Sequence, residues 1–414
     1  MSTIDLSVRA RGQSVVGTRS EARVDYVDAL RVLLILLVVA HHSVEAYVAS
    51  HAPEIVFADA PIPRVWAFLA VNASFFMGLF FFLAGYYTPQ AYDRRGAGRF
   101  LRDRLIRIGI PLLLGVVLIV PLAAWIRMAF YPGVSHLGGW EFVTRDFLGI
   151  GNKPDWWPKE ERWPQFSFGW LWFIEHLLIY AMLYTAWRLI TPPRPADAPP
   201  PAAPAGWMIF AYAIGLAAAS YVVRIWYPQD RWIAFLGFIQ MEPAHWPQYA
   251  SLFVIGVIAG RGHWIETMPR GRGLAWLAVG GGLALLLYVL VGTGLVGGGA
   301  PAVPASGATA SSPLPDWRPV VYDAFMCTGL CVGLPVAFRE LALGTGSLWR
   351  MLGRNVLAIY VFHFPFVELV QVGLMQTDLA KWIRLLLTWP IAVVLTVLFT
   401  NYVVLRLPGL RRVF

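Results

Sequence analysis

Long apolar blocks alternate with short polar segments along the whole chain. The apolar residues run together instead of recurring every three or four positions, and each block is near the roughly 20 residues that cross the hydrocarbon core as a helix. This pattern predicts an all-α fold, a polytopic transmembrane helical bundle. We expect ten spans, near residues 29–49, 68–89, 108–129, 168–190, 206–226, 247–263, 274–296, 319–338, 354–376 and 383–404.

Two regions leave the number of spans open. The apolar core of the sixth span is short and covers only residues 251–260. Residues 232–241 are a candidate for a further interfacial or re-entrant piece. Nine or eleven spans are therefore the alternatives to ten.

The composition agrees with a membrane protein. Of the 414 residues, 58% are apolar and 14% are charged, whereas soluble domains carry about 25% charged residues. This balance excludes a disordered chain, a secreted disulfide scaffold and an ordinary soluble enzyme. Cys327 and Cys331 lie four positions apart inside an apolar block, so we expect them to be small apolar fillers and we expect no metal site.

Basic residues predict the topology. A formal net charge of +9 would indicate nucleic acid in a soluble protein, but in a membrane protein Lys and Arg gather in cytoplasmic loops. With a cytoplasmic N-terminus, the inner segments hold 22 of the 33 Lys and Arg residues and leave 11 for the outer segments. We therefore expect both termini in the cytoplasm, the lipid bilayer as a partner, and no nucleic acid.

The order of apolar, polar and proline-rich segments also predicts how the chain is organised. We expect a cytoplasmic tail at 1–28, a transmembrane domain at 29–404 and a second cytoplasmic tail at 405–414. A Pro/Ala-rich linker at 191–205 joins two halves on the inner side.

The first span carries the richest chemistry. Arg31 and His42 are eleven positions apart, which places them within about 20° of each other on a helix and separates them by roughly 16 Å along its axis. Glu45 lies about 40° to the other side of Arg31. A cation at the inner surface can hold an anionic donor, and a histidine at mid-depth can act as a general base. The alternative is an interface anchor at Arg31 and a helix-packing contact between His42 and Glu45.

A second basic cluster follows the second span. Arg104 and Arg107 are three positions apart and project from one helix face at the inner surface. Their paired guanidinium groups suit phosphates. The alternative is that they serve only the topology.

Further ionisable groups lie inside predicted spans, where each costs several kcal/mol or more unless it is paired or hydrated. Together they indicate a polar cavity through the bundle, although each one is also compatible with a helix–helix contact. An outer loop at 131–166 adds four tryptophans and four acids that suit either a sugar or an interfacial aromatic belt. The candidates inside the spans are Glu175, His176, Arg224, Asp323, His363 and Glu368.

At these residues the chain resembles the integral-membrane acyltransferase family 3, which includes O-antigen O-acetyltransferases and periplasmic-glucan succinyltransferases. The resemblance runs through most of the chain, with its motifs in the family's order. It departs at His176, where the common motif has a second acid, and in ending at Phe414 without the hydrolase-like domain of some relatives. The matching segments are Asp25–Arg31 with the Arg31/His42 pair, Phe80–Tyr86, Phe100–Arg107, Leu171–His176 and Ala358–Pro365.

The resemblance implies a membrane-bound O-acyltransferase that moves an acetyl or succinyl group from cytoplasmic acyl-CoA to a hydroxyl of an extracytoplasmic saccharide. It places the enzyme in the bacterial inner membrane, with acyl-CoA as a donor substrate and no permanently bound cofactor. Arg31, Arg104 and Arg107 are then expected at the donor. His42, Glu45, Glu175 and His363 are the catalytic candidates, and the roles of His41 and His176 stay open.

Two other functions fit the same residues. A proton-coupled secondary transporter would use the buried histidines and glutamates as a proton relay. A non-catalytic scaffold would use none of them. Homo-oligomerisation is also open, because the spacing of Gly256 and Gly260 is too common to argue for a dimer.

Overall fold

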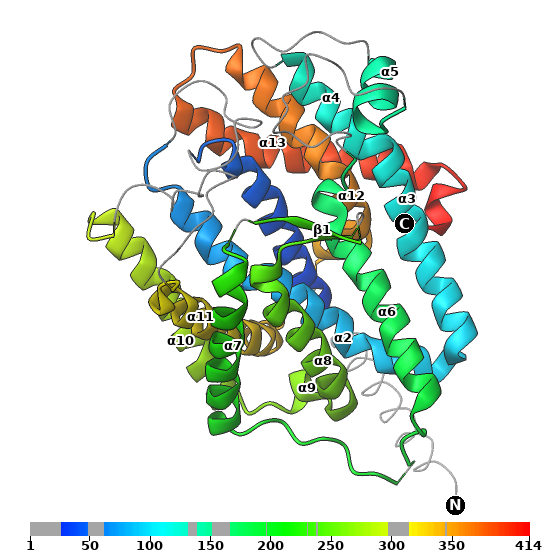
Figure 1. Cartoon of the computed structure of the whole chain (residues 1–414), viewed down its shortest axis with the longest axis vertical. Helices are drawn as coiled ribbons and strands as arrows, with labels where there is room; N and C mark the ends of the chain where they lie inside the picture. The colour runs from blue at the N-terminus through cyan, green and yellow to red at the C-terminus, as the bar shows by residue number, and fades with distance from the viewer. Residues whose placement is uncertain are drawn as a thin grey trace, which may run out of the picture.

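The computed structural model describes residues 26–48, 62–130, 139–150, 166–195, 197–229, 231–236, 239–296, 314–343 and 346–414. This part of the chain is an all-α helical bundle with one small hairpin, so the predicted fold class is confirmed (Figure 1). After the N-terminal helix Tyr26–Glu45 come α2 Trp66–Arg104, α3 Ile110–Leu114, α4 Val120–Phe130, α5 Gly139–Glu141, α6 Trp172–Ile190, α7 Gly206–Trp226, α8 Trp246–Gly262, α9 Trp264–Thr267, α10 Arg270–Gly292, α11 Trp317–Glu340, α12 Ser347–Met375 and α13 Lys381–Tyr402.

Each predicted span has a helical counterpart in the described residues. Eight helical stretches there are long and apolar enough to cross a membrane, and one of them, Trp66–Ile126, covers both the second and the third predicted spans. The sixth predicted span is α8, which has 17 residues. Ten crossings stay a prediction, and the long loop at 297–315 lies almost entirely outside the described residues.

The chain turns between the second and third predicted spans at Gly96. This glycine interrupts α2 with φ 72° and ψ 166°, a backbone conformation that residues with a Cβ rarely adopt. Helical structure then continues through π-turns at Leu105–Gly109 and Gly115–Ile119. Figure 1 shows α2 and α3 running in different directions on the two sides of this turn.

Residues 232–241 form neither a span nor a re-entrant helix. They hold a two-stranded antiparallel hairpin of β1 Ile233–Phe235 and β2 Ile239–Met241, in which Ala234 pairs with Gln240. The β-branched and aromatic residues of this stretch favour strands. The described residues of this stretch therefore form no further helix, and an interfacial position for the hairpin stays a prediction.

Helices α2 and α8 pack in backbone contact. A methyl group added at Gly85, Gly256 or Gly260 would overlap a backbone carbonyl oxygen of the facing helix, those of Phe253, Phe82 and Tyr86 respectively. Small residues allow such close approach between membrane helices. The Gly256/Gly260 pair thus packs within the chain.

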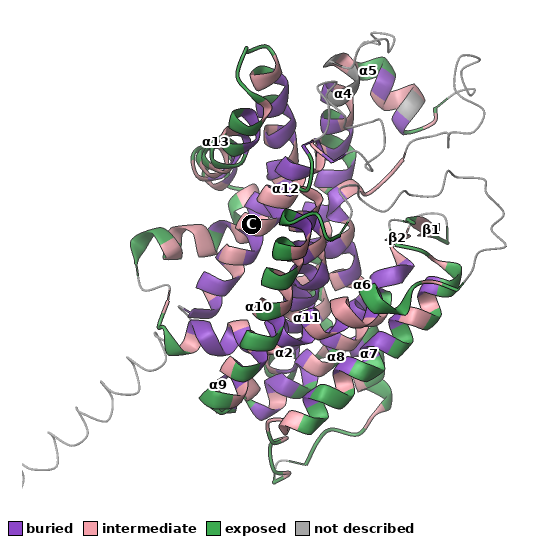
Figure 2. Ribbon diagram, turned by 90° about the vertical axis from the view of Figure 1, so that its left-hand side faces the viewer, coloured by how far each residue is buried: buried purple, intermediate pink, exposed green. Residues whose placement is uncertain are grey.

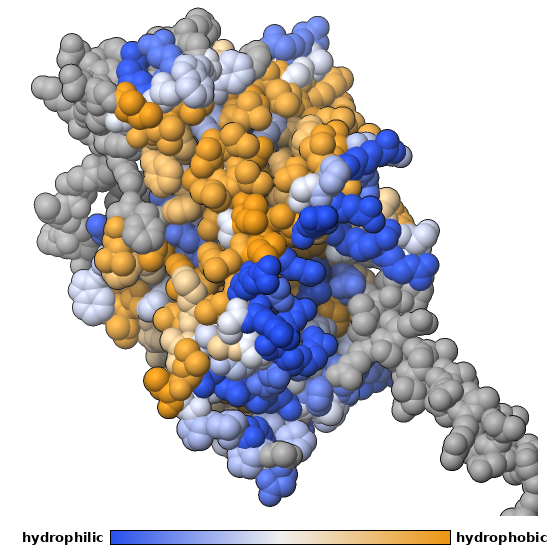
Figure 3. Space-filling model, turned by 90° about the vertical axis from the view of Figure 1, so that its right-hand side faces the viewer, coloured by the Kyte–Doolittle hydropathy of each residue, from blue (hydrophilic) through white to orange (hydrophobic). Residues whose placement is uncertain are grey.

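The outer face of the bundle suits lipid. Only 11% of the apolar window of α10 is buried, against 67% for α11, and Figure 2 shows the buried residues gathered on α2 and α11. Figure 3 shows a broad apolar surface bordered by hydrophilic side chains. Leu285 and Leu386 contribute to the exposed apolar surface, with exposed fractions of 64% and 70%.

The linker between the halves is held against the bundle. Trp264 Nε1 donates a hydrogen bond to the Pro201 carbonyl at 2.8 Å, and Arg272 Nη1 donates to the Pro204 carbonyl at 2.7 Å. The carbonyl groups of this proline-rich segment therefore find donors on α9 and α10.

We predict that Gly256→Leu destabilises the fold, because the new side chain must displace the backbone of α2. Overpacking of this kind costs typically about 1–3 kcal/mol and occasionally more. Thermal unfolding of the purified protein should show a lower midpoint for Gly256→Leu. The control is Gly282→Leu on α10, where an added Cβ meets nothing within 4 Å. Equal midpoints for the two variants would contradict the close packing of α2 and α8.

Candidate active site

Glu45 holds two histidines at the end of the N-terminal helix. Its Oε2 lies 2.7 Å from His42 Nδ1, and its Oε1 lies 3.4 Å from His41 Nε2. The spacings of three and four residues place both imidazoles beside the carboxylate. Because the carboxylate accepts the proton of His42 Nδ1, the Nε2 of His42 is left as the proton-accepting nitrogen.

His363 on α12 faces His42. The rings of His42 and His363 are 5.3 Å apart between centroids. His363 Nδ1 lies 2.8 Å from the Tyr360 carbonyl and 3.2 Å from the Ile359 carbonyl. Carbonyl oxygens only accept, so the proton of this neutral imidazole sits on Nδ1 and its Nε2 carries a lone pair. That Nε2 is buried and has no hydrogen-bond partner in the described part of the chain.

Pro365, two residues after His363, allows α12 to accept a hydrogen bond from Trp170, which lies just before α6. Pro365 lies inside α12 and has no N–H to donate to the carbonyl of Val361, four residues earlier. Trp170 Nε1 donates to that carbonyl instead, at 3.2 Å. The Trp170 ring also stacks on Phe364, with centroids 4.4 Å apart and planes within 9°. Phe364 in turn packs against His42 at 5.0 Å.

Two side chains of α2 contact His41. His41 stacks on Phe76 with centroids 5.2 Å apart. Asn72 lies 3.4 Å from His41 Nδ1 and donates to the Leu37 carbonyl at 3.1 Å. His41 is therefore held by α2 and Glu45, whereas His42 faces α12.

An arginine cluster, Arg31, Arg95, Arg104 and Arg107, lies at the other end of the N-terminal helix. Arg104 is within electrostatic reach of the other three guanidinium groups. Arg31 bonds Asp28 at 3.1 Å and lies over the Tyr87 ring at 4.9 Å.

The turn at Gly96 folds the arginine cluster together. Across this turn Arg95 bonds Asp103 at 2.6 Å, which brings Arg95 within electrostatic reach of Arg104. Arg107 lies on the π-turn that follows, a feature that is frequent at functional sites. This placement is consistent with the prediction that Arg104 and Arg107 project together. Arg95, which was not among the sequence candidates, lies within electrostatic reach of Arg104.

Glu175 is buried on α6 and contacts the hairpin. Its Oε2 accepts a hydrogen bond from the backbone N–H of Gln240 in β2 at 3.3 Å, so it belongs with the hairpin. His176 is buried beside it, with Nδ1 2.9 Å from the Trp172 carbonyl. Of the four catalytic candidates, His42 contacts both Glu45 and His363. Glu175 bonds the hairpin and lies within electrostatic reach of Tyr360, whose ring is 6.2 Å from that of His363.

The remaining candidates have structural partners or fall outside the described residues. Arg224 binds Asp323 with two hydrogen bonds of 3.1 Å between α7 and α11. Most of the aromatic and acidic outer loop at 131–166 lies outside the described residues, and Trp140 within it is 79% exposed. No three His, Cys, Asp or Glu residues in the described ranges lie close enough to hold a metal ion.

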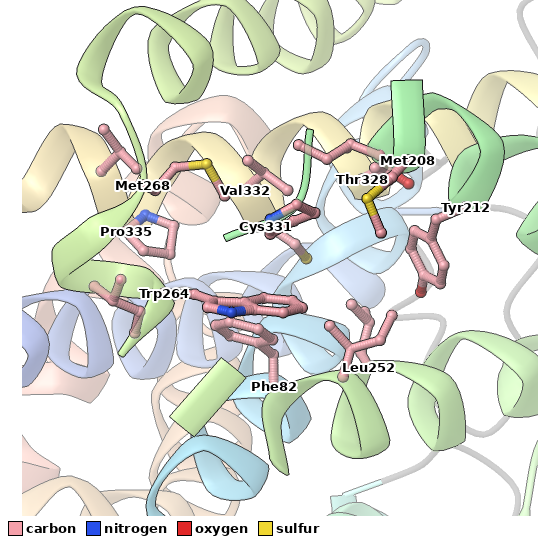
Figure 4. Close-up of a pocket in the computed structure, with 15 residues that line it drawn as sticks. Phe82, Met208, Tyr212, Leu252, Trp264, Met268, Thr328, Cys331, Val332 and Pro335 are labelled. Atoms are coloured by element: carbon pink, nitrogen blue, oxygen red, sulfur yellow. The ribbon is translucent and has the colours of Figure 1, made fainter. Parts of the chain in front are cut away.

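An apolar cavity of about 210 Å³ lies between α2, α7, α8, α9 and α11. Figure 4 shows Phe82, Trp264 and Cys331 among its lining residues. Its lining offers apolar surface and almost no polar groups. It is suited to apolar groups and holds none of the residues described above as acids or bases.

The family follows from the comparisons with known proteins. A family model described as an acyltransferase domain matches residues 24–404, nearly the whole chain. The chain belongs to acyltransferase family 3. No curated protein and no solved structure matches it. The protein is therefore a membrane-bound acyltransferase, and the transporter and scaffold alternatives are not supported.

Several parts of this acyltransferase site escaped the sequence analysis. The contact of Glu45 with His41 was readable from their spacing of four residues. The free carbonyls near Pro365 were expected, but their partner Trp170 is 191 positions from Val361. Such long-range contacts depend on how the helices pack.

We predict that Glu45→Gln lowers the kcat of acyl transfer by about 10²-fold or more while KM changes little. The amide can still accept the His42 proton, but it cannot stabilise the imidazolium that forms when His42 acts as a base. Steady-state kinetics of the purified protein test this. Asp378→Asn is the control, since Asp378 is exposed on the loop between α12 and α13. A wild-type kcat for Glu45→Gln would remove Glu45 from the mechanism.

Proposed function

We propose that the protein transfers an acetyl or succinyl group from cytoplasmic acyl-CoA to a hydroxyl group of an extracytoplasmic saccharide. One observation carries this proposal. A single helix, Tyr26–Glu45, places Arg31 in the arginine cluster at one end and His42 beside Glu45 and His363 at the other. The proposed setting is the inner membrane of a bacterium, with both termini in the cytoplasm.

The arginine cluster supplies the donor site. In the described part of the chain, carboxylates bond two of these four guanidinium groups, Asp28 bonding Arg31 and Asp103 bonding Arg95. The cluster of four arginines therefore keeps a positive charge among the described residues. Guanidinium forks bind phosphate oxygens with paired, charge-assisted hydrogen bonds. The phosphates of acyl-CoA would be held here, with the thioester extending along the helix toward His42.

The histidines supply the chemistry. His42 Nε2 takes the proton of the acceptor hydroxyl as its oxygen attacks the thioester carbonyl carbon. The new ester C–O bond forms, the C–S bond breaks, and the imidazolium returns the proton to the departing thiolate, which leaves as free CoA. Glu45 stabilises the imidazolium, and the lone pair of His363 Nε2 orients a hydroxyl or thiol proton. The proposed step assigns no role to Glu175, which accepts a hydrogen bond from the hairpin.

We predict that His42→Ala abolishes acyl transfer, because removing a general base costs about 10²–10⁴-fold. His41→Ala keeps the 2.7 Å contact between His42 and Glu45 and should lose much less. Mass spectrometry of envelope glycans, with each variant expressed in a gene-deletion strain, reports the added acetyl or succinyl mass. Correctly inserted His42→Ala protein that acylates at the wild-type rate would refute the proposed mechanism.

We predict that CoA raises the thermal unfolding midpoint of the wild type and that this effect disappears in Arg104→Ala/Arg107→Ala. Hydrogen bonds to charged groups contribute about 1.5–3 kcal/mol each, so losing two should weaken CoA binding by at least about 100-fold. Arg411→Ala/Arg412→Ala removes the same charge from the exposed C-terminal segment and serves as the control. Equal stabilisation of both double variants would place the donor elsewhere.

A further inference from the structure

A second group of aromatic and polar side chains surrounds Tyr249. It includes neither His42 nor His363. Figure 2 shows the hairpin of β1 and β2 at the edge of the bundle beside α6. We call this group the hairpin cluster. It consists of Trp172, Glu175, Trp232, Glu242, His245 and Tyr249, which come from α6, the hairpin and its flanks, and α8.

The rings of the hairpin cluster form a continuous set. Trp172 stacks on Tyr249 with centroids 5.3 Å apart and meets Trp232 edge-on at 5.6 Å. His245 stacks on the Tyr249 ring at 5.7 Å. Trp232 is 45% exposed, so this set of rings runs from the buried Tyr249 to the surface.

Polar groups line the same rings. Glu242 lies 3.5 Å from His245 Nε2, and both Glu242 and Arg224 are within electrostatic reach of Tyr249. Glu175 Oε1, His245 Nδ1 and Arg224 Nε are buried without a hydrogen-bond partner in the described ranges. Their side chains are only 5%, 4% and 8% exposed.

This combination is unusual for a purely structural cluster. Buried polar atoms are nearly always hydrogen-bonded, and an unsatisfied one costs about 1–3 kcal/mol. Three such atoms of different chemistry are present: a carboxylate oxygen of Glu175 and an imidazole nitrogen of His245 in the hairpin cluster, and a guanidinium nitrogen of Arg224, which is within electrostatic reach of Tyr249. A ligand that fits them needs both an apolar face and an edge of hydroxyl groups.

We propose that the hairpin cluster binds a sugar ring of the acceptor, and this proposal rests on the proposed function. A pyranose presents C–H bonds on its face, which pack on aromatic rings, and hydroxyl groups on its edge, which donate to carboxylates and accept from guanidinium groups. Aromatic stacking and a few polar groups are typical of such sites. The proposal thus assigns acceptor binding to the hairpin, whereas the sequence offered residues 131–166 as either a sugar site or an interfacial aromatic belt.

The start of α6 connects the hairpin cluster to the histidines. Trp170 stacks on Phe364, which packs against His42, and Trp172, two residues later, belongs to the hairpin cluster. One short segment therefore touches both sites. A saccharide of several units would place one ring at the hairpin and another, with the reacting hydroxyl, beside His42.

The test uses full-length protein and the unacylated oligosaccharide released from the envelope of a gene-deletion strain. Isothermal titration calorimetry measures its binding to wild type, Trp232→Ala, Glu242→Gln and Trp232→Phe. We expect Trp232→Ala and Glu242→Gln to bind roughly tenfold more weakly and Trp232→Phe to recover most of the affinity, because it keeps a stacking face. The CoA-induced thermal shift should stay at the wild-type value. Trp207→Ala on α7, where the side chain is 73% exposed, is the matched control.

Each outcome decides one of the two proposals. Wild-type affinity in Trp232→Ala and Glu242→Gln, or loss of the CoA shift together with oligosaccharide binding, would overturn the sugar site in favour of a structural cluster. Acylation by the wild type of an envelope component that is not a saccharide would also overturn it. A wild type that shows neither a CoA shift nor any acylated product would overturn the proposed function itself.

Discussion

The contact between Glu45 and His42 is the interaction on which the rest of the site depends. A carboxylate inside an apolar bundle is costly unless it is paired, and Glu45 meets this need with two imidazoles of its own helix. The pairing fixes the tautomer of His42 and turns its Nε2 toward α12. On the α12 side, His363 packs against His42, and Trp170 bonds the Val361 carbonyl two residues before His363.

Backbone packing complements this polar contact. The glycines between α2 and α8 allow two helices to touch along their backbones, so α2 presents one face to α8 and other residues, Asn72 and Phe76, to His41. Pro365 contributes differently. It leaves the Val361 carbonyl without an intrahelical donor, and Trp170 donates to that carbonyl from outside the helix. Small residues and a proline thus determine where the polar residues can meet.

Hydropathy was enough to predict the all-α bundle, and helix periodicity was enough to predict that Arg31 and His42 share a face, because both depend on local sequence. The meeting of His42 with His363 joins residues more than 300 positions apart, and the sequence supported it only as a similarity of membrane depth. The hairpin was missed because ten residues of mixed polarity between spans have no strong period. Glu175 was proposed as catalytic because it is buried and titratable, whereas its hydrogen bond to β2 depends on how α6 and the hairpin pack.

The length of the N-terminal helix also sets the distance between Arg31 and His42. Its two ends carry the arginine that the donor's phosphates would meet and the histidine that would act on the acyl group, roughly 16 Å apart along the axis. A donor held in this way stays on its own side of the membrane, and only its reactive end reaches the middle. In the proposed reaction the acyl group would change sides because its carrier is long. That reaction would require neither a pore nor alternation between inward- and outward-facing states.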